Sequence, residues 1–141
     1  MKFWDASAIV PLIVDEPARE RLLALVEADP VMFVWWGTPV ELVSALSRRE
    51  REGTLSPAMT AAAVDRVRRL ERSWQQVVPS DLLRLRAQRL LRVHPLRAAD
   101  SLQLAAALGI AGDDPASVSV VALDQRLLDA AQREGLGVAL A

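Results

Sequence analysis

The amino-acid sequence predicts a three-layer α/β/α fold with a central parallel sheet of four to five strands. Short apolar runs of strand length alternate with longer segments of helical periodicity along the 141 residues. Strands that alternate with helices pair in parallel through right-handed crossovers, and helices cover both faces of their sheet. Because no linker, repeat or low-complexity segment interrupts the pattern, we expect one domain over residues 1–141.

Two strands and four helices are predicted before residue 75. In order, these elements are a strand at residues 2–5, helices at 7–14 and 17–28, a strand at 31–36, and helices at 39–52 and 57–74. The second strand is a continuous apolar run with β-branched and aromatic residues, bounded by Pro30 and Gly37. The last of these helices begins with Ser56 as N-cap and Pro57 in its first turn, which are favoured positions for both residue types. Helices 39–52 and 57–74 therefore form a large insertion between the second and third strands.

Three strands and three helices are predicted in the rest of the chain. They are a strand at 76–78, helices at 80–93 and 96–110, a strand at 119–123, a helix at 124–134 and an edge strand at 138–140. The break at His94 and Pro95 separates two of the helices, and we interpret His94 as a turn or cap residue. The helix at 96–110 is apolar nearly all round, which predicts that it is buried.

The composition excludes several classes of chemistry. The chain has no cysteine and one histidine, so thiol catalysis, disulfides, HExxH zinc sites and paired histidine acid–base catalysis are excluded. Asp and Glu together number 18, so an enzyme of this composition depends on carboxylates acting through a metal ion. The sequence shows neither a signal peptide nor an apolar run of the ~18 residues that span a membrane. We therefore expect a cytoplasmic protein without membrane contact.

Four acids recur at one kind of position: the carboxyl end of a predicted strand or the first turns of a helix. They are Asp5, Glu41, Asp100 and Asp124. In a parallel sheet the loops that leave the carboxyl ends of the strands meet at one edge, where ligands bind, and nearby helix amino ends favour negative charge. Carboxylates without His or Cys select Mg²⁺-like ions over zinc. We therefore expect these four side chains to share a cleft and a divalent ion.

Each acid also has a structural interpretation. Asp5 and Asp124 are suited to be helix N-caps, and Thr38 with Glu41 has the spacing of a capping box. Asp100 is the hardest to explain structurally, because it lies on a helix with almost no polar face and has only Arg97 as a partner nearby in the sequence. We interpret Ser7 mainly as a helix-capping residue, with contact to a bound water as the alternative.

Four motifs, in order, resemble those of PIN domains. They are DASAIV at residues 5–10, TPVELVSAL at 38–46, LRAADSLQLAAA at 96–107 and VVALDQRL at 120–127. Their order and spacing are similar to those of VapC-type toxins from bacterial type II toxin–antitoxin systems. The resemblance implies an endoribonuclease that depends on Mg²⁺ or Mn²⁺, cleaves RNA phosphodiester bonds, is neutralised by a small cognate antitoxin and forms a homodimer. It also implies that the four acids are the catalytic and metal-binding residues.

One position departs from the family pattern, and one alternative function remains open. The family often has Ser or Thr two residues before the last acid, where this chain has Ala122. The alternative is a catalytically silent PIN-like module that binds an antitoxin or RNA. Receiver domains and haloacid-dehalogenase-type phosphatases do not fit. Lys2 is the only lysine, which excludes the late active-site lysine of receivers, and the segment DAS lacks the D-x-D of the phosphatases.

The charge is uneven along the chain. Residues 1–47 hold three bases and seven acids, a balance of −4, and residues 98–141 hold two bases and six acids, again −4. Residues 48–97 hold twelve arginines and five acids, a balance of +7. This basic segment is interpreted as an RNA phosphate contact, an antitoxin contact or a solvated face, with Arg97 as the best single phosphate contact. The tryptophans Trp35, Trp36 and Trp74 are interpreted mainly as core residues, with a place at the rim of the site as the alternative for Trp36.

Overall fold

A parallel five-stranded sheet forms the centre of the computed structural model, which describes residues 1–140. The strand order is β3-β2-β1-β4-β5, and all four neighbouring pairs are parallel. The strands are β1 (Lys2–Trp4), β2 (Phe33–Trp35), β3 (Gln75–Val77), β4 (Ser119–Val121) and β5 (Gly137–Val138). The predicted α/β class and strand count are confirmed.

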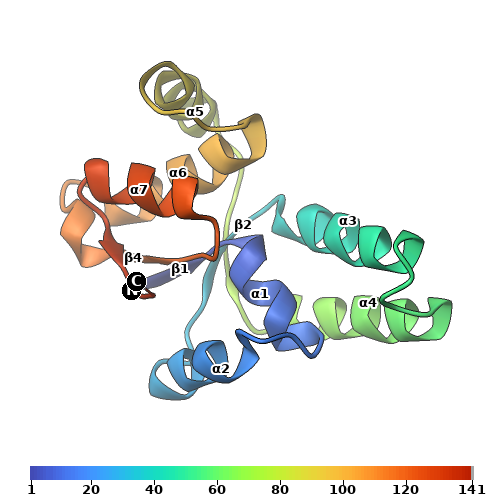
Figure 1. Ribbon diagram of the computed structural model, residues 1–141. Coiled ribbons are helices and arrows are strands. Elements are labelled where there is room, and N and C mark those ends of the chain that lie inside the picture. The colour runs from blue at the N-terminus through green and yellow to red at the C-terminus, as the bar shows by residue number, and fades with distance from the viewer. Residues whose placement is uncertain (141) are drawn as a thin grey trace.

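Helices cover both faces of this sheet (Figure 1). They are α1 (Ala6–Ile13), α2 (Arg19–Ala28), α3 (Thr38–Arg51), α4 (Pro57–Glu71), α5 (Asp81–Val93), α6 (Ala98–Ala111) and α7 (Gln125–Arg133), with a short 3-10 turn at Pro115–Ser117. In Figure 1, α1 and α2 lie on one side of the sheet, whereas α6 and α7 lie on the other. The predicted three layers are therefore present.

Alternate strand residues supply two separate cores. Trp4 and Val121 pack with helices α1 to α4 on one face, whereas Phe3 and Val120 pack with helices α5 to α7 on the opposite face. This alternation follows from the two-residue period of an extended chain. Burial on both faces explains why β1, β2 and β4 are mainly apolar, whereas the edge strand β3 begins with the exposed Gln75 and Gln76.

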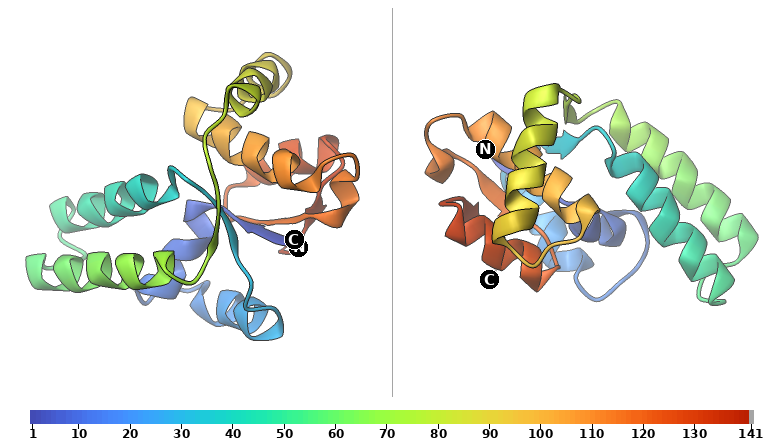
Figure 2. Two further views of the ribbon diagram at one scale, coloured as in Figure 1. Left: turned by 180° about the vertical axis from the view of Figure 1, so that it is seen from behind. Right: turned by 90° about the horizontal axis from the view of Figure 1, so that it is seen from above.

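Helices α3 and α4 form an antiparallel pair that extends away from the sheet (Figure 2). This pair is the insertion predicted between the second and third strands. Arg66 of α4 donates a hydrogen bond of 2.9 Å to the carbonyl of Ile13, at the end of α1. Arg49 of α3 pairs at 2.6 Å with Glu16, in the loop after α1. Arginines from both helices therefore tie the pair to the end of α1 and to the loop that follows it.

Several predicted boundaries are corrected by one to three residues. The longest difference is at α4, which ends at Glu71 rather than at residue 74, and β5 lies at Gly137–Val138 rather than at 138–140. Trp35 and Trp74 are buried as predicted, but Trp36 is 54% exposed, so its assignment to the core is wrong. Trp36 follows the last residue of β2 and lies in the turn that leads to α3, outside the strand residues that helices cover on both faces.

No helix within residues 1–140 combines the length and the hydrophobicity that crossing a bilayer requires.

Candidate active site

The four predicted acids line a single pocket of about 370 Å³. The pocket lies where β1, β2 and β4 end, as the geometry of a parallel sheet requires. Its lining comprises Asp5, Ala6, Ser7, Val10, Glu16, Glu41, Ala45, Arg48, Arg49, Asp100, Leu123 and Asp124. The structure thus brings together side chains from four segments that are far apart in the sequence.

Asp5 follows β1 and is the N-cap of α1. Its Oδ2 accepts a hydrogen bond of 3.0 Å from the backbone N–H of Ser7 and one of 2.5 Å from the Ser7 hydroxyl. Only 5% of Asp5 is exposed. The capping role is therefore real, but it places a nearly buried carboxylate on the wall of the acidic pocket.

Glu41 lies in the first turn of α3, after β2. The expected capping box is wrong, because the helix begins one residue early with Gly37 as N-cap, and no side chain caps it. Instead, the Glu41 carboxylate accepts a hydrogen bond of 2.7 Å from the side-chain amide of Gln103 on α6. Glu41 is thus held by a neighbouring helix rather than by the start of its own.

Asp100 occupies a different helical position from the one expected. Helix α6 begins at Ala98, so Asp100 lies in its first turn, half-buried, rather than within a buried apolar surface. One oxygen accepts a hydrogen bond of 3.3 Å from the backbone N–H of Arg97. Asp100 therefore accepts a hydrogen bond at the start of its helix, while its side chain also lines the pocket.

Asp124 follows β4 and is the N-cap of α7. It accepts hydrogen bonds from the backbone N–H groups of Arg126 at 2.9 Å and Leu127 at 3.4 Å. Ala122, which departs from the family pattern, is 1% exposed and packs in the core beneath α5 to α7. It is not among the residues that line the acidic pocket in the described part of the chain.

Burial and mutual repulsion raise the pKa of three of the acids. Burial raises the pKa of Asp5 above its ordinary value; the Ser7 hydrogen bonds oppose this shift, and the Asp100 and Asp124 charges add to it. Burial and the Asp5 charge raise the pKa of Glu41 to about 7, despite the Gln103 hydrogen bond. Burial also raises the pKa of Asp100, and the Asp124 charge adds to this shift. The pocket therefore concentrates more negative charge than its own donors neutralise.

This donor set suits a hard divalent cation. Oxygen ligands without nitrogen or sulfur are those that Mg²⁺ and Mn²⁺ prefer, and a cation would relieve the repulsion among the carboxylates. Within residues 1–140, no three acidic or histidine side chains are already spaced to hold one ion. Mg²⁺ usually retains several waters and binds few protein oxygens directly, so carboxylates that are too far apart to contact one ion together can still bind it through water.

Two arginines stand beside the acids. Arg49 is held by Glu16 and by the carbonyl of Ala45, whereas Arg48 is exposed and forms no ion pair with any described residue. Arg48 and Arg49 also line a larger adjoining pocket of about 700 Å³ between the end of α1 and the α3–α4 pair. Arg97, which we had favoured as the phosphate contact, does not line the acidic pocket. Arg48 is the better candidate.

Gln103 is the site residue to which the sequence analysis assigned no role. It is fully buried, and its amide contacts both Glu41 and Thr38. A signal was present in the sequence. Gln103 is a polar residue on an apolar helix, three positions after Asp100, and residues at this spacing share a helix face.

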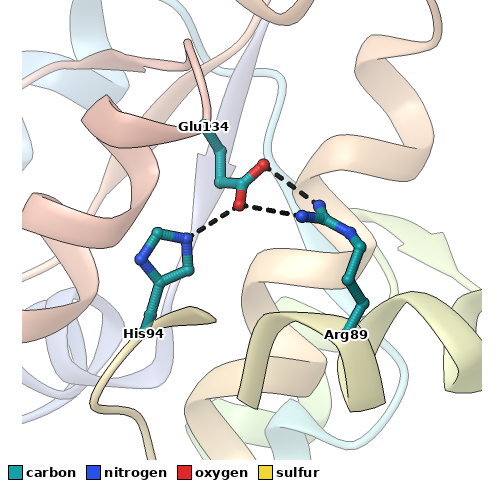
Figure 3. Close-up of polar contacts among 3 residues, drawn as sticks. All are labelled: Arg89, His94 and Glu134. Carbon is teal, nitrogen blue, oxygen red and sulfur yellow. Dashed lines mark hydrogen bonds and ion pairs between the residues drawn. The ribbon is translucent and has the colours of Figure 1, made fainter. Parts of the chain in front are cut away.

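A second polar cluster joins α5 to the end of α7 (Figure 3). Glu134 accepts hydrogen bonds of 3.0 and 3.3 Å from Arg89, and its Oε1 lies 2.8 Å from Nε2 of His94. His94 is the C-cap of α5, as predicted, and its side chain is 4% exposed. None of the three residues lines the acidic pocket. We therefore assign this cluster to the stability of the helical layer.

Comparison with known proteins identifies the family. FitAcB from Neisseria gonorrhoeae has a similar structure, with a TM-score of 0.68, 16% identity, and 98% of this chain and 96% of that chain covered. VapC20 from Mycobacterium tuberculosis, described as a sarcin–ricin-loop-cleaving toxin, gives a TM-score of 0.71 at 16% identity over 96% of each chain. PAE2754 from Pyrobaculum aerophilum gives 0.64 at 19% identity over 92% of this chain and 78% of that one. No curated protein sequence matches significantly. Because the PIN domain model matches residues 2–133, this chain belongs to the PIN domain family.

Proposed function

We propose that this chain is a metal-dependent endoribonuclease and the toxin of a toxin–antitoxin pair. The observation that carries the proposal is the single pocket lined by Asp5, Glu41, Asp100 and Asp124, where burial and like charges raise carboxylate pKa values. Such a cluster is costly unless a cation neutralises it. Membership of the PIN domain family and the likeness to VapC20 support nuclease chemistry.

The four carboxylates would hold Mg²⁺ or Mn²⁺, directly or through water. A bound ion of this type supplies an activated water and offsets charge on the phosphate oxygens. The chain's own residues prepare the site. Ser7 fixes the Asp5 carboxylate, Gln103 holds Glu41, and the starts of α6 and α7 fix Asp100 and Asp124. Arg48, at the rim, would contact an RNA phosphate.

The partners follow from the same resemblance. We propose an RNA substrate, a small cognate antitoxin, a homodimer and a cytoplasmic location for a single domain spanning residues 1–141. The likeness to FitAB, whose structure was solved bound to a DNA fragment, supports a nucleic-acid partner, and the likeness to the VapC20 toxin supports an antitoxin. Co-purification of this chain with the product of an adjacent small reading frame tests the antitoxin, and light scattering of the purified chain tests the homodimer.

The nuclease is tested by metal-dependent cleavage of total RNA by the purified chain. We expect cleavage with Mg²⁺ or Mn²⁺, none with EDTA, and recovery when the metal is restored. Asp5→Asn and Asp100→Asn should each abolish cleavage while circular dichroism shows an intact fold. Cleavage that survives EDTA or either substitution would show that the acidic pocket is not the catalytic site.

The alternative is a catalytically silent PIN-like module that binds an antitoxin or RNA. The wild-type chain would then bind its partner with or without metal and cleave no RNA at any Mg²⁺ or Mn²⁺ concentration. The retention of all four acids in one pocket favours the enzyme.

A further inference from the structure

Gln103 joins the helices that carry two of the proposed metal ligands. It lies on α6, one turn after Asp100, and is fully buried. Its amide nitrogen donates a hydrogen bond of 2.7 Å to Oε2 of Glu41 and one of 2.9 Å to the hydroxyl of Thr38. Both acceptors lie in the first turn of α3. A side chain from the middle of one helix thus reaches the start of another.

The chemistry of the partners fixes the orientation of this amide. An ionised carboxylate accepts hydrogen bonds but donates none, so the NH₂ group of Gln103 faces Glu41 in the ionised form that binds a metal. The opposite orientation would place two oxygens against each other. In the observed orientation, Oε1 of Gln103 is buried without a partner in the described part of the chain. A buried acceptor without a partner destabilises the fold.

This unsatisfied oxygen distinguishes a functional role from simple packing. A Met or Leu would fill the same space without burying an unpaired acceptor. Unlike Met or Leu, the amide donates hydrogen bonds to both Glu41 and Thr38. Oε1 of Glu41 makes no hydrogen bond to any described residue, and Glu41 lines the acidic pocket. One carboxylate oxygen is therefore fixed, while the other is free for a ligand.

We infer that Gln103 is a positioning residue, which holds the Glu41 carboxylate in the conformation that binds the metal ion. The inference rests on the proposed function of the pocket. A free glutamate side chain must lose rotational freedom when it binds an ion, whereas one already held by Gln103 loses less. In metalloproteins, removal of such an outer hydrogen bond lowers metal affinity by about tenfold to a hundredfold.

The test compares Mn²⁺ binding to the full-length wild type and to Gln103→Met by calorimetry. We expect Gln103→Met to bind Mn²⁺ about tenfold to a hundredfold more weakly, measured at a temperature where the variant is folded, because the lost hydrogen bonds to Thr38 and Glu41 also lower its melting temperature. Ser101→Ala is the matched control. Ser101 is a buried polar residue on the same helix, and among the described residues its hydroxyl bonds only the carbonyl of Ala98, so its replacement should leave Mn²⁺ affinity unchanged. Gln103→Leu provides a second variant if Gln103→Met does not fold.

A double-mutant cycle shows whether Gln103 acts through Glu41. In a Glu41→Ala background, Gln103→Met should change Mn²⁺ affinity by less than about twofold, because its target is absent. Equal losses in both backgrounds, or wild-type affinity in Gln103→Met, would overturn the positioning role while leaving the metal site intact. A wild-type chain that binds no Mn²⁺ would instead overturn the proposed function and this inference with it.

Discussion

The Ser7 hydroxyl accepts a hydrogen bond of 2.9 Å from the backbone N–H of Leu123, which lies 116 residues later in the chain. The same hydroxyl donates to the Asp5 carboxylate at 2.5 Å. Ser7 therefore links the segments that follow β1 and β4, and each of these segments carries a pocket acid. The prediction that Ser7 caps the helix is wrong, because Asp5 is the N-cap and Ser7 positions its carboxylate.

Replacing Ser7 tests this link. Ser7→Ala removes the donor to Asp5 and leaves the Leu123 N–H without its acceptor, so we expect a loss of about 1 kcal/mol in the free energy of unfolding. Because the Asp5 carboxylate then keeps only the backbone N–H of residue 7 as a donor, it is less firmly oriented, and cleavage of RNA should fall more steeply than stability. Urea denaturation and single-turnover cleavage measure the two effects. Ser44→Ala, on an exposed position of α3, is the control, and an equal cleavage rate in the two variants would contradict the link.

The acidic pocket predicts an unusual pH dependence of the metal-free protein. Burial and the Asp5 charge raise the pKa of Glu41 from 4.5 to about 7, so the folded state binds this proton more tightly than the unfolded chain. The resulting stability is fully present below pH 4.5 and is lost as the pH rises through about 7. We expect a loss of about 2 kcal/mol between these limits after allowance for solvent screening. Chemical denaturation in EDTA at several pH values measures this change in the free energy of unfolding.

Two further measurements separate Glu41 from other titrating groups. Glu41→Gln should flatten this pH dependence, since the group that titrates is gone. Mg²⁺ should raise the melting temperature of the wild type more at pH 8 than at pH 5.5, because ligands must lose their protons to bind a metal. A wild type and a Glu41→Gln variant with the same pH profile would show that Glu41 is not responsible.

Sequence reasoning located the sheet and the four acids because both depend on local pattern. Asp5 and Asp124 directly follow apolar strands, so the topology of a parallel sheet alone brings them together. The contacts that hold the acids depend on side chains packed between distant helices. Gln103 and Glu41 are separated by 62 residues, and no local pattern predicts that these two side chains meet. The capping-box error at Glu41 has the same origin, since a one-residue shift in the helix start moved Thr38 inside the helix.

The position of Arg48 in the lining of the acidic pocket leads us to expect that it contributes to the salt dependence of RNA binding. It stands at the rim of the pocket without an ion-pair partner among the described residues, so its charge is available to a phosphate. Arg48→Gln should weaken RNA binding at low salt and reduce the slope of log affinity against log salt by about 1. Arg84→Gln is the control, because Arg84 is exposed on α5 and pairs with Asp81. Binding should be measured in Ca²⁺ or with an Asp100→Asn background to prevent cleavage. Equal slopes for the two arginine variants would exclude Arg48 as a phosphate contact.

The Arg89–His94–Glu134 cluster predicts a loss of stability without a loss of activity. Burial alone would raise the pKa of Glu134, but hydrogen bonds from Arg89 and His94 lower it below 4.5. The stability that Glu134 contributes is therefore present above pH 4.5 and is lost as the pH falls through its folded-state value. Glu134→Ala should cost about 1–3 kcal/mol at pH 7, because it leaves the buried His94 ring without its acceptor.

Arg89→Ala provides the matched comparison for Glu134→Ala. The side chain of Arg89 is 52% exposed whereas that of Glu134 is 15% exposed, so removing the arginine should cost less than about 1 kcal/mol. The two variants should keep wild-type cleavage rates at temperatures where they are folded, because neither residue lines the acidic pocket. Urea denaturation at pH 7 and pH 4 gives the free energy of unfolding of each variant for this comparison. If Arg89→Ala is as destabilising as Glu134→Ala, the contact with His94 contributes nothing, and the cluster stabilises the helical layer through its surface ion pair alone.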